Sequence, residues 1–180
     1  PLCHRRSGLL QRGGGMSRWI RALAVAVATG GFISFLFARP QGAGGRIRRD
    51  SGAGTAASLL GLGMFLWLPS DPRLLVALAV ALAAGLLVIH GSRAMLSQDD
   101  DPRIVLDEIL GMWVAAAYLP RTWVWLAGAF LLFRVFDVWK PWPIRASQHW
   151  PGSVGILADD VLAGLYANML LQLIRASIQP

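Results

Sequence analysis

The sequence predicts an all-α membrane protein, a polytopic helical bundle with about four or five transmembrane or re-entrant helices. Hydrophobic residues make up 55% of the 180 residues, and the mean hydropathy is +0.51. Charged residues make up 15%, whereas soluble domains carry about 25%. Several apolar runs approach the roughly 20 residues that an α-helix needs to cross a bilayer. A lipid environment therefore explains this composition better than a soluble core does.

The apolar segments follow one another along the chain, with polar connections between them. They are predicted at residues 19–38, 54–68, 74–90, 104–119, 122–138 and 156–174. Gly30 and Gly31 lie inside the first segment and offer a helix break, which is tolerated at membrane depth where protein covers the backbone. Pro69 closes the second segment, and a short turn at Pro120 joins residues 104–119 to residues 122–138. A loop rich in Pro and Trp is expected over residues 140–155.

A single domain is expected over residues 19–180, preceded by a basic N-terminus at residues 1–18 that we expect to be disordered. Nine of the 17 Lys and Arg residues lie before Asp50. Cys3 is the only cysteine, which excludes an intrachain disulfide and a cysteine metal cluster.

The net charge of +7 predicts membrane orientation and not nucleic-acid binding. The chain has no recognition-helix pattern and no stripe of alternating aromatic and basic residues. Arginines near membrane segments favour the cytoplasmic side, which assigns the N-terminus and the loops at residues 91–103 and 140–155 to that side. Residues 39–49 are also basic, so we predict that the first segment re-enters or lies in the interface instead of crossing.

The tryptophans fit this layout because indole prefers the depth where lipid meets water. The group at the predicted outer boundary is Trp67, Trp123 and Trp125. The group at the predicted inner boundary is Trp139, Trp142 and Trp150.

The acidic residues are placed so that helices crossing in alternating directions bring five of them to one face. They are Asp107, Glu108, Asp137, Asp159 and Asp160. Arg134 and Lys140 lie beside them in the sequence. Carboxylates with two cations at a lipid–water boundary indicate a metal site that acts on a phosphorylated membrane substrate.

Each acidic motif also has a purely structural interpretation. Asp107 and Glu108 begin a segment, where acids complement the helix dipole and are solvated. Asp137 ends a helix, where the dipole disfavours an acid, and it shares a face with Arg134, so a structural ion pair is an alternative. Asp159 and Asp160 lie about one turn inside an apolar segment, a costly position that favours a ligand such as Mg²⁺ over packing alone.

The order D-E-x-x-G, R-x-x-D-x-x-K-P-x-P and G-x-x-x-D-D-x-x-A-G resembles the phosphatidylglycerophosphatase A family of bacterial membrane lipid phosphatases. The matching positions are Asp107, Glu108 and Gly111; Arg134, Asp137, Lys140, Pro141 and Pro143; and Gly155, Asp159, Asp160, Ala163 and Gly164. The resemblance covers about residues 52–175. Before it the sequence departs from the family's Gly- and Pro-rich stretch, with Ala57 where glycine is usual.

The resemblance implies Mg²⁺-dependent hydrolysis of phosphatidylglycerophosphate to phosphatidylglycerol and phosphate, at the cytoplasmic face of a bacterial inner membrane. The five carboxylates are expected to serve the metal and its water, and Arg134 and Lys140 to bind the substrate phosphate. Metal-activated water is favoured over an aspartate nucleophile.

Two other functions stay open at this stage. A small ion or metabolite transporter would also carry intramembrane acids, although these gather at one face and do not line a path. A lipid phosphotransferase of the CDP-alcohol type uses membrane aspartates and a divalent metal, but its D-G-x-x-A-R spacing is absent. The sequence makes no prediction of the oligomeric state.

Overall fold

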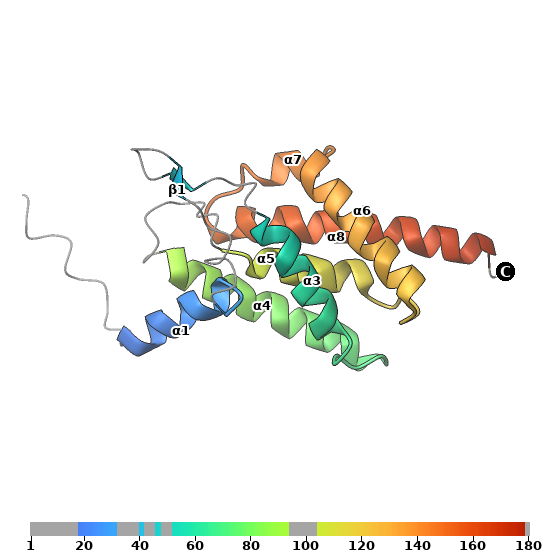
Figure 1. Ribbon diagram of the computed structural model, residues 1–180, viewed down its shortest axis with the longest axis horizontal. Helices are drawn as coiled ribbons and strands as arrows, with labels where there is room; N and C mark the ends of the chain where they lie inside the picture. Colours follow the sequence, from blue (N-terminus) through green and yellow to red (C-terminus); the bar gives the residue numbers. More distant parts are fainter. Residues whose placement is uncertain (1–17, 32–39, 42–45, 48–51, 94–103, 179–180) are drawn as a thin grey trace, which may run out of the picture.

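The computed structural model describes residues 18–31, 40–41, 46–47, 52–93 and 104–178, and these are almost entirely helical (Figure 1). The helices are α1 (Arg18–Ala28), α3 (Ala53–Phe65), α4 (Arg73–Arg93), α5 (Leu106–Ala116), α6 (Trp123–Trp139), α7 (Ile144–Ser147) and α8 (Ser153–Ile178). Strand β1 (Pro40–Gln41) pairs antiparallel with β2 (Arg46–Ile47). The predicted all-helical character is confirmed apart from this short ladder. Residues 1–17, with Cys3, lie outside the described residues, so the predicted N-terminal boundary stays a prediction.

Helix α5 is the centre of the bundle. It packs against α3, α4, α6 and α8, and Figure 1 shows it enclosed by these longer elements. Its Met112 is fully buried in a cluster with Phe65 of α3 and Phe133 of α6. The indole nitrogen of Trp113 donates a hydrogen bond of 2.8 Å to the Gly61 carbonyl oxygen, which ties α5 to α3. The position of α5 therefore depends on every neighbouring helix.

The helix ends differ from the predicted segments in ways that backbone geometry explains. Helix α5 ends before residue 119 because the chain turns at Tyr118, which has a φ of 57°. Helix α1 stops at Ala28 and is followed by Gly30 and Gly31, with φ values of +60° and +66°. The loop expected over residues 140–155 contains a short helix, α7, that begins directly after Pro143, as proline allows at a helix start.

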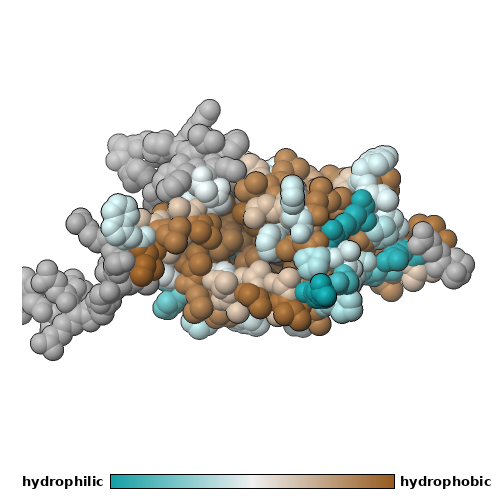
Figure 2. Space-filling view, turned by 90° about the horizontal axis from the view of Figure 1, so that it is seen from below, coloured by the Kyte–Doolittle hydropathy of each residue, from teal (hydrophilic) through white to brown (hydrophobic). Residues whose placement is uncertain are grey.

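Two helices of the described chain are long and apolar enough to cross a membrane, α4 over Arg73–Ser92 and α8 over its whole length. Only 22% of the apolar stretch of α4 is buried inside the protein, so most of this helix has an outward apolar surface. The exposed side chains of α4 include Leu75, Val76, Val80 and Leu87. Figure 2 shows apolar side chains covering much of one face of the molecule, with hydrophilic ones gathered towards one end. This surface supports association with a membrane.

Candidate active site

Three carboxylates from two helices meet in the interior. Asp107 and Glu108 lie in the first turn of α5, and Asp160 lies about two turns into α8. One oxygen from each of these three side chains lies within 4.8 Å of the others. Asp160 is 4% exposed and Asp107 is 9% exposed. We call Asp107, Glu108 and Asp160 the acidic triad.

The acidic triad fits a divalent cation. Asp107 Oδ1 and Glu108 Oε2 are buried and have no hydrogen-bond partner in the part of the chain that the structure describes. Buried polar oxygens without a partner are costly, and like charges at this spacing repel each other strongly in a medium of low dielectric constant. A hard cation would satisfy these oxygens, because Mg²⁺ takes carboxylate ligands together with water and phosphate oxygens.

The helix register explains why these acids meet. Gly111 follows Asp107 by four residues and Gly164 follows Asp160 by four, so each glycine lies one turn from its acid on the same helix face. A Cβ on Gly111 would lie 2.7 Å from the Asp160 carbonyl oxygen, so the two backbones touch there. The contact between α5 and α8 therefore sets the distance between the carboxylates of the two helices.

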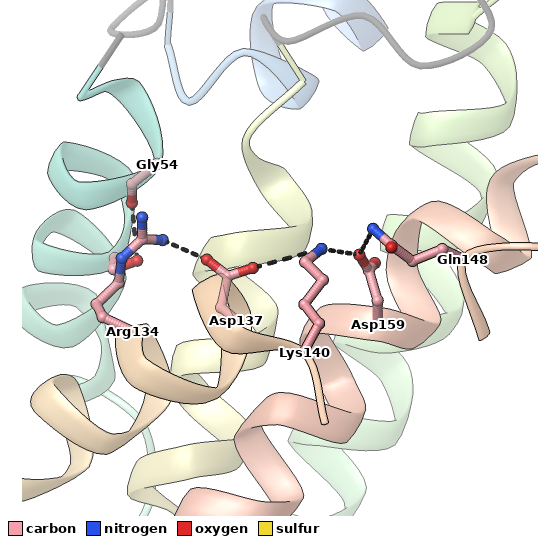
Figure 3. Close-up of polar contacts among 7 residues, drawn as sticks. Gly54, Arg134, Asp137, Lys140, Gln148 and Asp159 are labelled. Atoms are coloured by element: carbon pink, nitrogen blue, oxygen red, sulfur yellow. Dashed lines mark hydrogen bonds and ion pairs between the residues drawn. The ribbon is translucent and has the colours of Figure 1, made fainter. Parts of the chain in front are cut away.

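Four of the charged residues form an ion-pair chain beside the acidic triad (Figure 3). Arg134 Nη1 lies 2.7 Å from Asp137 Oδ2, and Lys140 Nζ lies 3.7 Å from Asp137 Oδ1. The Lys140 ammonium also donates a short hydrogen bond to Asp159 Oδ2. The ion-pair chain thus runs from Arg134 through Asp137 and Lys140 to Asp159, connecting the end of α6 with α8.

Lys140 is the only lysine in the chain, and its backbone is unusual. It follows the last residue of α6 with φ 48° and ψ 63°, a left-handed conformation that is uncommon for a residue with a side chain. Burial lowers the pKa of Lys140, but the carboxylates of Asp159, Asp160 and Asp137 raise it more, so the pKa lies above its ordinary value. Lys140 is therefore a fixed positive charge at neutral pH.

The start of α3 closes the site on a third side. A Cβ on Gly54 would lie 2.6 Å from Glu108 Oε1 and 3.2 Å from Arg134 Nη1, so the backbone here contacts both groups. The Ser58 hydroxyl donates a hydrogen bond of 2.8 Å to the Gly54 carbonyl oxygen within α3. The side chain of Thr55 is exposed.

The structure brings all seven predicted site residues into one region and divides them into two groups. Asp107, Glu108 and Asp160 form the acidic triad, whereas Asp137 and Asp159 pair with Arg134 and Lys140. The assignment of all five carboxylates to the metal stays a prediction.

Sequence analysis missed Gln148, whose amide donates a hydrogen bond of 3.1 Å to Asp159 Oδ2. It also missed the contact of Gly54 with Glu108 and Arg134. No local pattern identifies either residue, because both act across the fold.

The described chain is a helical protein with two helices long and apolar enough to cross a membrane and with a buried cluster of three carboxylates. The family model described as Phosphatidylglycerophosphatase A matches residues 36–175. The chain therefore belongs to the phosphatidylglycerophosphatase A family, which confirms the resemblance seen in the three motifs.

Relatives from two bacteria carry the family's name, and a third relative is named for a different phosphatase activity. The chain is 35% identical over 125 residues to Phosphatidylglycerophosphatase A of Escherichia coli (strain K12), covering 67% of this chain and 73% of that protein. It is 34% identical over 116 residues to the protein of that name in Haemophilus influenzae, covering 63% and 66% respectively. It is 40% identical over 80 residues to a Putative phosphatidylinositol-3-phosphatase of Bacteroides thetaiotaomicron, covering 43% and 50%. No solved structure matches the chain.

Proposed function

We propose that the protein hydrolyses phosphatidylglycerophosphate to phosphatidylglycerol and phosphate, with Mg²⁺ bound at the acidic triad. Family membership supports the reaction and the lipid substrate. The observation that carries the metal proposal is a pair of buried oxygens, on Asp107 and Glu108 next to Asp160, that have no hydrogen-bond partner among the described residues. Bound Mg²⁺ would neutralise phosphate charge and lower the pKa of a coordinated water.

The chain's own cations have a separate role in this proposal. A phosphate monoester carries two negative charges, and fixed positive groups stabilise the additional charge that develops during its hydrolysis. Arg134 and Lys140 would bind the phosphate oxygens, and Asp137 and Asp159 would hold these two cations in place. Water supplies the oxygen that bonds to phosphorus, and the bond from phosphorus to the glycerol oxygen breaks.

The proposed location is a bacterial inner membrane, with about four or five helices spanning or re-entering it and the site at the cytoplasmic face. The exposed Trp139, Trp142 and Trp150 near the site, and the exposed Trp67 and Trp123 elsewhere, support two interfacial belts. Cysteine labelling tests this in a Cys3→Ser background. A probe at His149→Cys should react only from the cytoplasmic side, and one at Ser70→Cys only from the other. Labelling of both from one side would refute the topology.

The decisive experiment is phosphate release from phosphatidylglycerophosphate by the purified protein in detergent, with Mg²⁺ and then with EDTA. Asp160→Asn should abolish release, whereas Asp71→Asn, at an exposed position in the α3–α4 connection, should not. Phosphatidylinositol 3-phosphate belongs in the same assay because of the name of the Bacteroides relative. Full activity in EDTA would refute the metal proposal, and no release by the folded wild-type protein would refute the function.

A further inference from the structure

Gln148 lies at the end of the ion-pair chain, where two donors meet on one oxygen (Figure 3). Its Nε2 donates to Asp159 Oδ2 at 3.1 Å, and the Lys140 ammonium donates to the same oxygen. The side chain of Asp159 is 8% exposed and that of Lys140 is 21% exposed, so water has little access to this junction. Gln148 is therefore in contact with the group that orients the proposed phosphate-binding lysine.

The loop that carries Gln148 is held directly against α8. A Cβ on Gly155 would lie 2.3 Å from the Trp150 carbonyl oxygen and 3.4 Å from the Gln148 carbonyl oxygen. The loop can approach this closely only because residue 155 has no side chain. The Trp150 amide also donates a hydrogen bond of 3.0 Å to the Ser147 carbonyl oxygen, which orders the turn after α7. Gln148 is thus presented to Asp159 by a segment that packs closely against α8.

We infer that Gln148 is a positioning residue, which fixes the Asp159 carboxylate so that Asp159 in turn fixes Lys140 for the substrate phosphate. This inference rests on the proposed function. Asp159 adjoins Asp160 in the sequence, and among the described residues the side-chain donors to Asp159 are Lys140 and Gln148, so without Gln148 the carboxylate would be held by Lys140 alone. The neutral amide adds a second donor on Oδ2 without competing with Lys140 for the negative charge. A carboxylate at position 148 would repel Asp159, and a cation would displace Lys140.

The kinetic test compares Gln148→Ala and Gln148→Glu with the wild type, using phosphatidylglycerophosphate and Mg²⁺. Gln148→Glu keeps the shape of the side chain but replaces the donor with a negative charge. Gln148→Ala should lower kcat about tenfold, as expected for the loss of a hydrogen bond to a charged group, and Gln148→Glu should lower it further. KM should change much less than kcat. His149→Ala, at an exposed position in the same loop, is the matched control and should keep wild-type kinetics.

A second measurement does not depend on activity and uses the fact that Lys140 is the only lysine. Isotopic labelling of the lysine ε-position gives a single NMR signal in detergent micelles. In Gln148→Ala this signal should move towards the value of free lysine, and in His149→Ala it should not move. Thermal unfolding of each variant separates loss of positioning from loss of fold.

The outcomes distinguish the inference from the function. Wild-type kcat in both Gln148 variants, with an unmoved lysine signal, would overturn the inference while leaving the phosphatase intact. If both Gln148 variants lose unfolding temperature to the same extent and cooling restores their kcat, the inference would also be overturned, because the role of Gln148 would then be structural. If the wild type releases no phosphate, the proposed function fails. The NMR measurement still tests the inference in that case, because an unmoved lysine signal in Gln148→Ala would reject the positioning of Lys140 by Gln148 through Asp159.

Discussion

The carbonyl oxygen of Gly111 in α5 occupies the place where a side chain on Gly164 of α8 would begin. A Cβ on Gly164 would lie 2.3 Å from that oxygen, a separation that real Cβ atoms essentially never show. Because the obstructing atom belongs to backbone, only a shift of a whole helix could relieve the clash. The same contact sets the separation of the acids one turn away.

Gly164→Ala should therefore destabilise the protein by about 1–3 kcal/mol, as overpacking of a tight interface does. It should also reduce phosphate release by more than the unfolded fraction explains, because α5 and α8 move apart at the acidic triad. Thermal unfolding and activity, measured on the same detergent sample, check both effects. Gly63→Ala is the control, since a Cβ there meets no atom of the described residues within 4 Å and Ala favours the helix. Equal behaviour of the two variants would contradict the proposed packing role.

Mg²⁺ should stabilise the folded protein in proportion to its occupancy of the acidic triad. At a concentration of about 100 times the dissociation constant, the gain is about 2.7 kcal/mol by mass action. Asp160→Asn should abolish this shift, and Asp71→Asn should retain it. In EDTA, Asp160→Asn should be at least as stable as the wild type, because the substitution removes one of three ionisable groups crowded together in a buried site. Strong destabilisation of Asp160→Asn in EDTA would indicate a structural role for Asp160 instead.

Lys140→Met should lower the stability by roughly 3 kcal/mol, since it leaves the buried Asp159 and the half-buried Asp137 without their shared cation. The raised pKa of Lys140 means that this stabilisation is complete below the unfolded-state value of about 10.4. It is lost as the pH rises through the higher folded-state value, so the mutant effect should be constant across neutral pH.

The exposed ion pair between Arg73 and Asp71 provides the matched comparison for Lys140. Its side chains are 85% and 50% exposed, so Arg73→Met should change the stability by less than about 1 kcal/mol. Chemical denaturation of the two variants at neutral pH makes the comparison. A small effect for Lys140→Met would mean that solvent already screens the ion-pair chain.

Asn168 holds the far end of α5 and should matter for stability. Its Nδ2 donates hydrogen bonds of 3.0 Å and 2.7 Å to the carbonyl oxygens of Ala115 and Ala117. Asn168→Leu keeps the side-chain size but removes both donors, which should cost about 1–3 kcal/mol. Ser177→Ala, which removes an exposed bond within α8, should be nearly neutral. Thermal unfolding that does not separate the two variants would refute this role of Asn168.

Local patterns predicted most of the helices, because long apolar runs bounded by prolines and polar turns favour helices of similar length. They did not predict the limits of α5, since its end depends on Tyr118 adopting a left-handed conformation and on donors from α8. Helix α7 was also missed, because a four-residue helix leaves almost no periodic pattern. The predicted metal set and the placement in the membrane await the experiments above.

The sequence by itself indicated the helical character, the family and the seven charged residues that the fold brings together, because residue type and spacing along one helix are local properties. Only the tertiary structure decided how those residues divide, with Asp107, Glu108 and Asp160 together and Asp137 and Asp159 paired to cations. It also decided that Gln148 and Gly54 contact the site. The physical reason is that these contacts join different helices, and their geometry depends on how closely glycine allows the backbones to approach.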